Sequence, residues 1–408
     1  MADSDRQLVV AVDIGTSKVV ALIGAVADDG AVTLVGEGTH PCTGLKKGVV
    51  VNVELTVESI REAIAKASQM AVCEVDGVYV GVAGSHIRSY NKLGKVAVHA
   101  DEVSQDDIDR VMASARTLNL ADNEKILHVL AQEFKIDDHA GIRQPLGMSG
   151  VSLEVQAHII TGAINSIRNI ETCIRRCGLG VDDLVLEQLA SSYACLTEDE
   201  KELGVCLVDI GGGTTDIAVF VNGALCHTSV IPIAGDQVTS DLALALRCTV
   251  QNAVQIKERY ACALPGLVNP EDTVEVPSVG GRPPRAIARQ TLAEVVEPRY
   301  EELFGFILED LRRNGFEDLV GAGIVLTGGS SKIQGAQELA EEVFNKPVRI
   351  GNPQHVQGLE DKANNPIYST AVGLLLYAAQ DVLRHGPGPK LEQDGLLARI
   401  SRWFKGSF

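Results

Sequence analysis

Short apolar runs separated by glycine-rich or polar turns fill the first part of the chain. Leu8–Asp13, Lys18–Val26 and Val32–Glu37 are rich in aliphatic and β-branched residues, and Asp28-Asp29-Gly30 lies between two of them. Runs of this length favour β-strands, and tight turns between them favour an antiparallel meander. The same arrangement returns near the middle of the chain. Three further strands are predicted there, at Val205–Asp209, Asp216–Val221 and Ala224–Ile231.

The first turn of each meander carries nearly the same sequence. Val12-Asp13-Ile14-Gly15-Thr16-Ser17 recurs as Val208-Asp209-Ile210-Gly211-Gly212-Gly213-Thr214-Thr215. An acidic residue at a strand end, followed by glycines and hydroxyls, makes a hairpin whose N–H and O–H groups can hold a phosphate. Two such hairpins half a chain apart predict two like-folded halves with a nucleotide between them. Helix and strand patterns alternate after each meander, which predicts an α/β fold.

Two segments interrupt this duplicated pattern. The first, between Val78 and Thr161, predicts a small inserted subdomain of strand, helix, strand and strand, with a polar loop before the helix. Its elements are Val78–Ala83, a helix starting at the capping sequence Ser104-Gln105-Asp106-Asp107, then Ile126–Ile136 and Val151–Ile160. The second segment, about Val238–Glu302, has helical runs around a proline-rich loop at 279–284.

Composition narrows the class of protein. The chain has 408 residues, of which 45% are hydrophobic and 22% charged, so it should form two or more globular domains. Its 54 acidic and 36 basic residues give a net charge of −18. Such a charge argues against a body that binds nucleic acid.

The last residues differ from this acidic body. Residues 384–395 are rich in glycine, proline and polar side chains and predict a flexible linker. Residues 396–408 predict an amphipathic membrane-targeting helix, because apolar residues recur at helical spacing and basic residues occupy other positions. The alternative is a terminal helix docked on the core. The apolar face is Leu396, Leu397, Ile400, Trp403 and Phe404, and the basic residues are Arg399, Arg402 and Lys405.

Three glycine-containing motifs occur in a characteristic order. DIGTSK at 13–18, DIGGGTTD at 209–216 and IVLTGGSS at 324–331 are accompanied by helical segments at 186–192 and 369–374. This set resembles the actin, Hsp70 and sugar-kinase superfamily. The resemblance implies a duplicated actin-like (ribonuclease-H-like) two-domain fold with ATP and Mg²⁺ in the interdomain cleft.

The resemblance also implies individual roles. Asp13 and Asp209 would hold Mg²⁺ through water molecules, because this ion keeps much of its hydration shell. Lys18 could reach a phosphate or point away from the site, and Val254 stands where relatives often have an acidic residue. The implied phosphate cradle is Gly15, Thr16, Ser17, Gly211, Gly212, Gly213, Thr214 and Thr215. The implied adenosine contacts are Lys257, Glu258, Gly328, Gly329 and Ser330.

Glu187 is the candidate for hydrolysis. It lies on the segment where the superfamily places an acid or amide that orients the attacking water, and a carboxylate can accept a proton from water. The alternative is a capping or salt-bridge role. At most a slow ATPase is expected, in a protein that is primarily structural.

Over nearly its whole length the chain resembles the FtsA family of bacterial cell-division proteins. The resemblance rests on the insertion after Ala83 and on the sequences VPSVGGRPP at 276–284 and TLAEVVEPRY at 291–300. It implies subdomain 1A at 1–83 and 163–196, 1C at 84–162, 2A at 197–236 and 305–358, 2B at 237–304 and a closing helix of 1A at 359–383.

Family membership implies a cytoskeletal adaptor that polymerises and tethers the FtsZ ring to the cytoplasmic face of the inner membrane at the septum. The implied partners are the FtsZ C-terminal tail, further copies of the chain, an anionic membrane surface and downstream division proteins, with no nucleic acid. Arg285, Arg289 and Arg299 are candidates for contacting the FtsZ tail, or alternatively are solvated surface charges. A small-molecule kinase and a pilus-assembly actin homologue are the alternative functions that share the nucleotide motifs.

Overall fold

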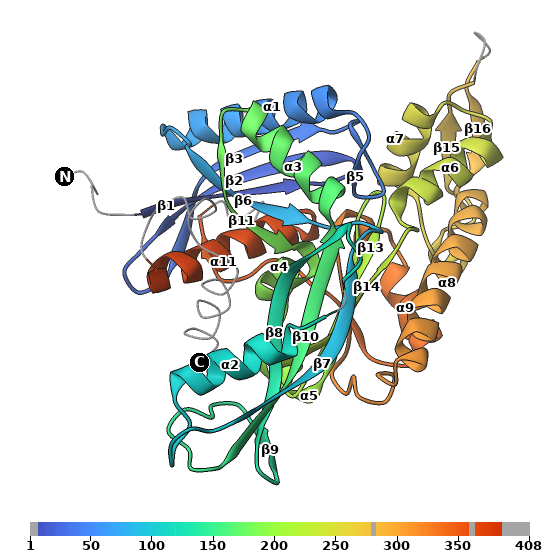
Figure 1. Ribbon diagram of the computed structural model, residues 1–408. Helices are drawn as coiled ribbons and strands as arrows, with labels where there is room; N and C mark the ends of the chain where they lie inside the picture. Colours follow the sequence, from blue (N-terminus) through green and yellow to red (C-terminus); the bar gives the residue numbers. More distant parts are fainter. Residues whose placement is uncertain (1–6, 119, 279–282, 359–363, 386–408) are drawn as a thin grey trace.

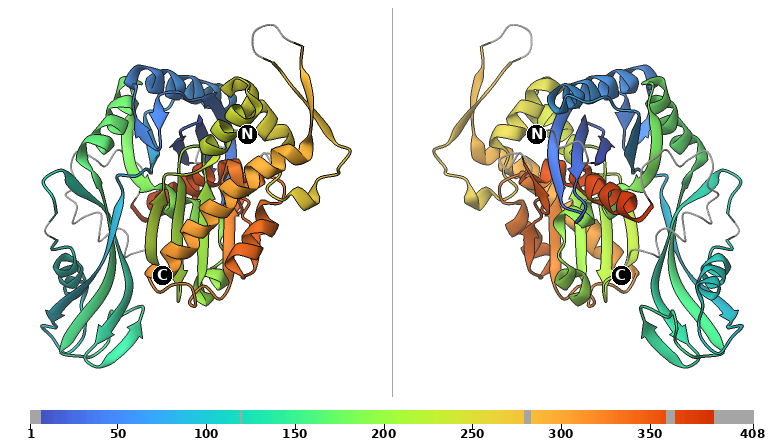
Figure 2. Two further views of the ribbon diagram at one scale, coloured as in Figure 1. Left: turned by 90° about the vertical axis from the view of Figure 1, so that its right-hand side faces the viewer. Right: turned by 90° about the vertical axis from the view of Figure 1, so that its left-hand side faces the viewer.

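The computed structural model describes residues 7–118, 120–278, 283–358 and 364–385. The predicted membrane helix at 396–408 and most of the predicted linker lie outside these residues. Two large sheets lie side by side, a smaller sheet projects from one end of the molecule, and a narrow hairpin projects from the other (Figures 1 and 2).

The first large sheet is built on the predicted meander. Strands β1 (Gln7–Ile14), β2 (Lys18–Val26) and β3 (Val32–Pro41) pair antiparallel, which confirms the three predicted strands. Parallel pairing then adds β6 (Gly77–Val82) beside β1 and β11 (Gly180–Leu186) beside β6. β1 and β2 are nearly continuous buried runs, because helices cover both faces of the sheet.

The second large sheet repeats this topology. A meander of three strands is extended by two parallel strands in the order β14-β13-β12-β17-β18, which corresponds to β3-β2-β1-β6-β11. The duplication predicted from the two hairpin sequences is therefore confirmed. The strands are β12 (Val205–Ile210), β13 (Thr215–Val221), β14 (Ala224–Ile231), β17 (Gly323–Thr327) and β18 (Val348–Ile350).

Helices separate and cover the two sheets. α1 (Val53–Ala71) packs on β2 and β3, and α3 (Ile164–Arg176) lies beside α1. On the other face, α11 (Ser369–His385) packs on β1 and against α4 (Glu187–Cys195), which also contacts β12 and β13. The second half carries α5 (Glu198–Leu203), α6 (Gly235–Leu246), α7 (Val250–Tyr260), α8 (Arg289–Arg313) and α9 (Ala336–Phe344).

The first insertion is a four-stranded sheet with one helix, but the predicted strand assignment needs a correction. Its strands run in the order β7-β10-β8-β9, and α2 packs on β7 and β10. Val78–Ala83, predicted as its first strand, belongs to β6 of the first large sheet. The predicted polar loop is instead β7, whose mostly exposed side chains show no hydrophobic alternation. The elements are β7 (Arg88–Ala97), α2 (Gln105–Ala115), β8 (Glu124–Ile136), β9 (His139–Ile142) and β10 (Ser152–Ala163).

The second insertion also differs from its prediction. The proline-rich loop is flanked by strands β15 (Thr273–Val276) and β16 (Arg285–Ala288) rather than directly by helices. Short apolar runs in a two-stranded hairpin give a weak sequence signal, since little of the hairpin is buried. The following helix, α8, continues across the predicted 2B–2A boundary at 304/305 and contains Pro298.

Two smaller boundaries also move. β19 (Val356–Gln357) pairs with β3, so the chain rejoins the first sheet before the predicted boundary at 358/359. α11 includes residues 384 and 385, which the sequence assigned to the linker. The remaining short elements are β4 (Leu45–Lys46), β5 (Val49–Val50), η1 (Pro265–Leu267), η2 (Gly329–Lys332) and η3 (Pro366–Tyr368).

Close approach of α4 and α11 depends on one glycine. A β-carbon on Gly373 of α11 would lie 1.8 Å from the carbonyl oxygen of Ala190 on α4. Backbone cannot yield as a flexible side chain does, so any larger residue must push the two helices apart. These helices contact both large sheets, and their spacing therefore sets the relation between the two halves.

Gly373→Ala should lower the free energy of unfolding by about 1–3 kcal/mol, the usual cost of overpacking, or more if the helices cannot separate. Gly305→Ala on α8 is the matched control, because a β-carbon there meets nothing within 4 Å. Alanine in an open helical site should raise the unfolding free energy by about 0.5–1 kcal/mol. Urea unfolding followed by circular dichroism measures both. Equal stability of the two variants would contradict the packing argument.

Candidate functional site

The two glycine-rich turns face each other across the junction of the halves. A β-carbon on Gly213 would lie 2.6 Å from Oγ1 of Thr16, and one on Gly212 would lie 3.2 Å from Oγ of Ser17. A side chain at position 213 would therefore collide with the opposite turn, and one at position 212 would crowd it. The strand ends before these turns carry Asp13 and Asp209, which are therefore brought to the same place.

A cavity of about 680 Å³ opens beside the facing turns. It is bordered by both hairpins, the start of α4, the end of α7 and the loop after β17. All but one of the residues predicted to bind phosphate, metal or adenosine or to act in hydrolysis line this cavity. The exception is Thr215. Its buried hydroxyl donates to the carbonyl of Ile233 at 2.7 Å. The lining residues from that prediction are Asp13, Gly15, Thr16, Ser17, Lys18, Glu187, Asp209, Gly211, Gly212, Gly213, Thr214, Lys257, Glu258, Gly328, Gly329 and Ser330.

Asp209 is held by hydroxyl groups from the interdomain helices. Its Oδ2 accepts hydrogen bonds from Ser191 Oγ at 2.7 Å and Thr370 Oγ1 at 3.2 Å. Ser191 lies on α4 and Thr370 on α11, so helices of the first half orient a carboxylate of the second. These hydrogen bonds link the helical segments predicted at 186–192 and 369–374 directly to the cleft.

Asp216 is a site residue that our reading of the sequence missed. It lies directly opposite Asp209 in the β12–β13 pair and also lines the cavity. Thr214 Oγ1 donates to its Oδ2 at 3.0 Å, whereas its buried Oδ1 has no hydrogen-bond partner among the described residues. The signal was present as the last letter of DIGGGTTD, because the strand-end rule that selected Asp209 applies equally to the acid that begins the return strand.

Burial disfavours the ionised form of these carboxyl groups. It raises the pKa of Asp13 to about 7, against the attraction of Lys18, and raises the pKa of Asp216 to about 8, with Asp209 adding to the effect. Burial, together with the neighbouring Asp13, also raises the pKa of Glu187 well above its usual range. A cation entering the cleft would reduce the repulsion between the ionised carboxylates and so favour their ionisation.

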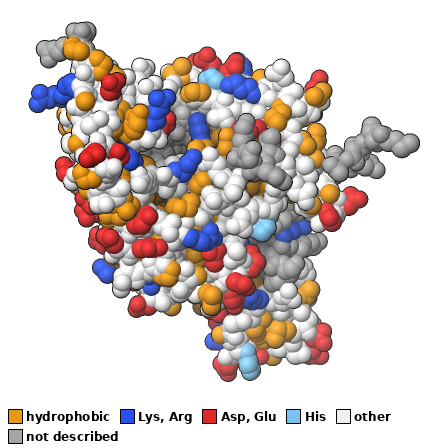
Figure 3. Space-filling model, turned by 180° about the vertical axis from the view of Figure 1, so that it is seen from behind, with side chains coloured by type: hydrophobic (Ala, Val, Ile, Leu, Met, Phe, Trp, Pro, Cys, Tyr) orange, Lys and Arg blue, Asp and Glu red, His pale blue; other side chains and the backbone are white. Residues whose placement is uncertain are grey.

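Lys18 lines the cavity rather than pointing away from it. Its Nζ lies 5.5 Å from the centre of the Tyr368 ring, and burial lowers the pKa of the ammonium group. Lys257 is tied to the opposite wall, where its Nζ donates to the carbonyl of Gly235 at 2.9 Å. Seen from behind, Lys and Arg side chains gather between the two halves (Figure 3). Those of the cavity are Lys18, Lys257, Arg259, Arg289 and Lys332.

The donor set matches a hydrated metal ion better than a directly bound one. Among the residues that the structure describes, no three His, Cys, Asp or Glu side chains are grouped closely enough to hold a metal by themselves. The Oδ1 atom of Asp216 has no partner among the described residues, and Asp13 and Asp209 lie at the ends of their strands. These three carboxylates are suited to accept hydrogen bonds from metal-bound water. The residues therefore fit a magnesium ion that water and phosphate would bind directly and that the protein would hold through the water.

Comparison with known proteins identifies the family. A family model described as "Cell division protein FtsA" matches residues 206–373, and one described as "SHS2 domain inserted in FTSA" matches residues 84–161. The chain is 57% identical to the cell division protein FtsA of Pseudomonas aeruginosa over 98% of both chains. The chain belongs to the FtsA family of cell division proteins. It is also 46% identical to FtsA of Escherichia coli K12, over 98% of this chain and 97% of that one.

Solved structures show that FtsA-type chains share the actin-like fold with more distant proteins. The PilM-PilN type IV pilus biogenesis complex matches with a TM-score of 0.66 at 14% identity, over 91% of this chain and 98% of that one. MreB5 of Spiroplasma citri bound to ADP gives 0.56 at 13% identity, over 92% and 98%. A MamK double helical filament gives 0.53 at 15% identity, over 91% and 98%. The predicted actin-like fold is thus confirmed, and the cell-division family takes precedence over the pilus and kinase alternatives.

The arginines proposed for the FtsZ tail are not gathered into one patch. Arg299 forms ion pairs with Asp241 at 2.7 Å and with Glu302, while Arg289 donates to the Tyr260 carbonyl and lines the cleft. These two are ten residues apart on α8, about 15 Å along its axis. Arg285, on β16, is exposed and donates to the carbonyl of Leu246.

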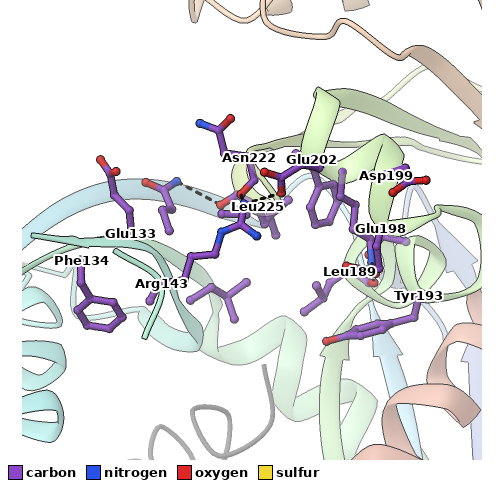
Figure 4. Close-up of a pocket in the computed structure, with 18 of the residues that line it drawn as sticks. Glu133, Phe134, Arg143, Leu189, Tyr193, Glu198, Asp199, Glu202, Asn222 and Leu225 are labelled. Atoms are coloured by element: carbon purple, nitrogen blue, oxygen red, sulfur yellow. Dashed lines mark hydrogen bonds and ion pairs between the residues drawn. The ribbon is translucent and has the colours of Figure 1, made fainter. Parts of the chain in front are cut away.

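A second cavity, of about 540 Å³, lies where the FtsA-type insertion meets α4, α5 and β14 (Figure 4). Arg143 of the insertion bridges Glu202 of α5 and the carbonyl of Asn222. Beside it, the side chains of Ser89, Asn91 and Gln132 donate to the carbonyls of Thr228, Cys226 and Leu225 at 3.0, 3.0 and 3.1 Å. The insertion therefore contacts the second half through side chains that bond the outer edge of β14.

No helix within the described residues has the length and apolarity needed to cross a membrane.

The raised pKa of Asp216 predicts pH-dependent stability of the nucleotide-free protein. In the unfolded chain this carboxyl ionises above its ordinary value of 3.8, whereas in the folded protein it stays protonated up to about pH 8. Its contribution to stability is therefore lost as pH rises from 3.8 to about 8. The Asp216→Asn variant lacks this titration. Its unfolding free energy relative to that of the parent protein should therefore be about 1–4 kcal/mol higher at pH 8 than at pH 5.

Thermal and urea unfolding at the two pH values, without nucleotide or metal, measure this difference. Asp318→Asn is the control, since Asp318 is exposed on the loop after α8. A pH-independent effect of Asp216→Asn would show that the carboxyl is ionised in the folded protein.

Proposed function

We propose that this FtsA-family protein binds Mg-ATP between its two halves and works as a nucleotide-dependent, self-associating adaptor at the membrane. The observation that carries the proposal is the pair of facing glycine turns with three acids at their base. Backbone N–H groups and hydroxyls of these turns can hold phosphate oxygens. Lys18 adds a positive charge from the first half.

Each acid has a different chemical task in this proposal. Asp13, Asp209 and Asp216 would accept hydrogen bonds from water bound to Mg²⁺, and the ion would neutralise negative charge on the phosphates. Glu187, at the start of α4, lines the same cavity and would orient a water and accept its proton. Burial raises the pKa of Glu187 well above its usual range and so opposes the ionised form that accepts a proton from water. Slow hydrolysis, rather than rapid turnover, is therefore the expected chemistry.

Asp209→Ala should weaken Mg-ATP binding by several-fold to about a hundredfold, because it removes a carboxylate that orients the metal and leaves Ser191 and Thr370 without their acceptor. Isothermal titration calorimetry with and without Mg²⁺ measures the change. Asp122→Ala, an exposed acid in the insertion, is the control. Equal Mg-ATP affinity in the Asp209 variant and the parent protein would remove Asp209 from the metal site.

The adaptor part of the proposal rests on family membership and on the terminal sequence. The MamK filament is an example of self-association within this fold, and we extend it to copies of this chain. Arg285, Arg289 and Arg299 are the candidates to contact acidic residues of an FtsZ tail, and Arg285 is the exposed one of the three. Residues 396–408 would bind an anionic membrane from the cytoplasmic side. The tethered protein would then help to recruit downstream division proteins to the septum. A single short helix gives weak, reversible binding, and a polymer aligns many such anchors.

Trp403→Glu should abolish sedimentation with anionic liposomes while ATP binding persists. A charge within the apolar face that loses even ~1.5 kcal/mol lowers affinity about tenfold per anchor, and a polymer compounds this loss. Ser401→Glu is the matched control, because it adds the same charge away from the apolar face. Sedimentation of the Trp403 variant equal to that of the parent would return the alternative of a helix docked on the core.

A further inference from the structure

The insertion makes a direct contact with the residue before Glu187. Leu186 ends β11, the outermost strand of the first large sheet, and is also the N-cap residue of α4. Its N–H donates to Nε2 of His128 at 3.0 Å. His128 lies on β8 of the insertion and is only 8% exposed. A side chain of the inserted subdomain thus occupies the open edge of β11 at the point where strand becomes helix.

Glu187 follows this contact immediately and has little freedom on its other side. A β-carbon on Gly81 of β6 would lie 2.9 Å from Cγ and 3.2 Å from Oε1 of Glu187. The carboxylate therefore rests on the backbone of β6, and the chain that carries it is held by His128. These two constraints direct the side chain into the cavity that also contains Asp13, Asp209 and Asp216.

The first turn of α4 has few other polar side-chain anchors. Leu186 offers no side-chain cap to the helix. The carboxamide of the fully buried Gln188 has no hydrogen-bond partner among the described residues. Because the bond to His128 is buried, its loss would leave the Leu186 N–H unsatisfied and allow the turn to shift.

We infer that His128 is a positioning residue for Glu187, through which the insertion sets the geometry of the water-orienting acid; the inference rests on the proposed role of Glu187. To accept from Leu186, the imidazole must be neutral at Nε2, with its proton on Nδ1. His128 does not itself line the cavity, so its effect should fall on hydrolysis and not on ATP affinity.

The test uses the full chain, four single variants and one double variant. His128→Leu removes the acceptor, and His128→Gln restores an acceptor oxygen at similar reach. Gln132→Ala, four residues further along β8, loosens the contact of the insertion with β14 but leaves Leu186 bonded. Glu187→Gln gives the reference loss of the acid. Calorimetry gives the ATP affinity, single-turnover phosphate release gives the hydrolysis rate, and thermal unfolding confirms that each variant is folded.

His128→Leu should release phosphate about 10- to 100-fold more slowly than the parent protein, the range expected when a reacting group is misplaced by about 1 Å. Its ATP affinity should stay within about twofold, because the phosphate and metal residues are untouched. His128→Gln should recover most of the rate, and Gln132→Ala should keep it. Combining His128→Leu with Glu187→Gln should slow release no further than Glu187→Gln alone, since both act on one group.

The outcomes separate this inference from the proposed function. If Glu187→Gln slows release but His128→Leu does not, His128 is structural and the inference fails while the role of Glu187 stands. Equal losses in the Leu and Gln variants at position 128, or a matching loss in Gln132→Ala, would indicate a general effect of the insertion and also overturn it. If Glu187→Gln releases phosphate at the parent rate, or the parent releases none, the hydrolytic role fails together with the inference, while the measured ATP affinity tests the binding proposal separately.

Discussion

The burial of several acidic side chains at the junction of the two halves is the constraint on which the rest of the site depends. Asp13 and Asp209 end equivalent strands of the duplicated sheets, and the facing turns force them together. Carboxylates in such a place are unfavourable when ionised, because water is displaced and each repels the others. Hydroxyl groups of α4 and α11 bond Asp209, and Lys18 adds a positive charge. A bound cation would complete this arrangement and stabilise the cleft.

The interdomain helices connect this charge to the shape of the molecule. α4 carries Ser191 and Glu187, while α11 carries Thr370 and the glycine that permits its approach to α4. A ligand in the cleft would therefore act on the same two helices that set the distance between the sheets. Its binding and the domain arrangement would be coupled through packing and hydrogen bonds alone.

Much of this architecture was predictable because its causes are local in the sequence. The two meanders have continuous apolar runs, and the paired hairpin motifs reveal the duplication. β7 was missed because its exposed polar residues are stabilised by pairing with β10, a contact distant in sequence. Asp216 was visible in its motif, but its proximity to Asp209 depends on strand register. The bond from Leu186 to His128 spans 58 residues between two subdomains, so no local pattern could indicate it.

The side-chain contacts of the insertion with β14 affect the tendency of the protein to aggregate. β14 is an outer strand of its sheet, and exposed strand edges can recruit strands from other molecules. Here amide and hydroxyl groups of Ser89, Asn91 and Gln132 occupy its carbonyls without extending the sheet. The insertion thus covers the exposed edge of β14 while keeping its own hydrophobic core. Nascent chains in which the second half folds before this cover is seated would be the ones most exposed to mispairing and in greatest need of chaperone protection.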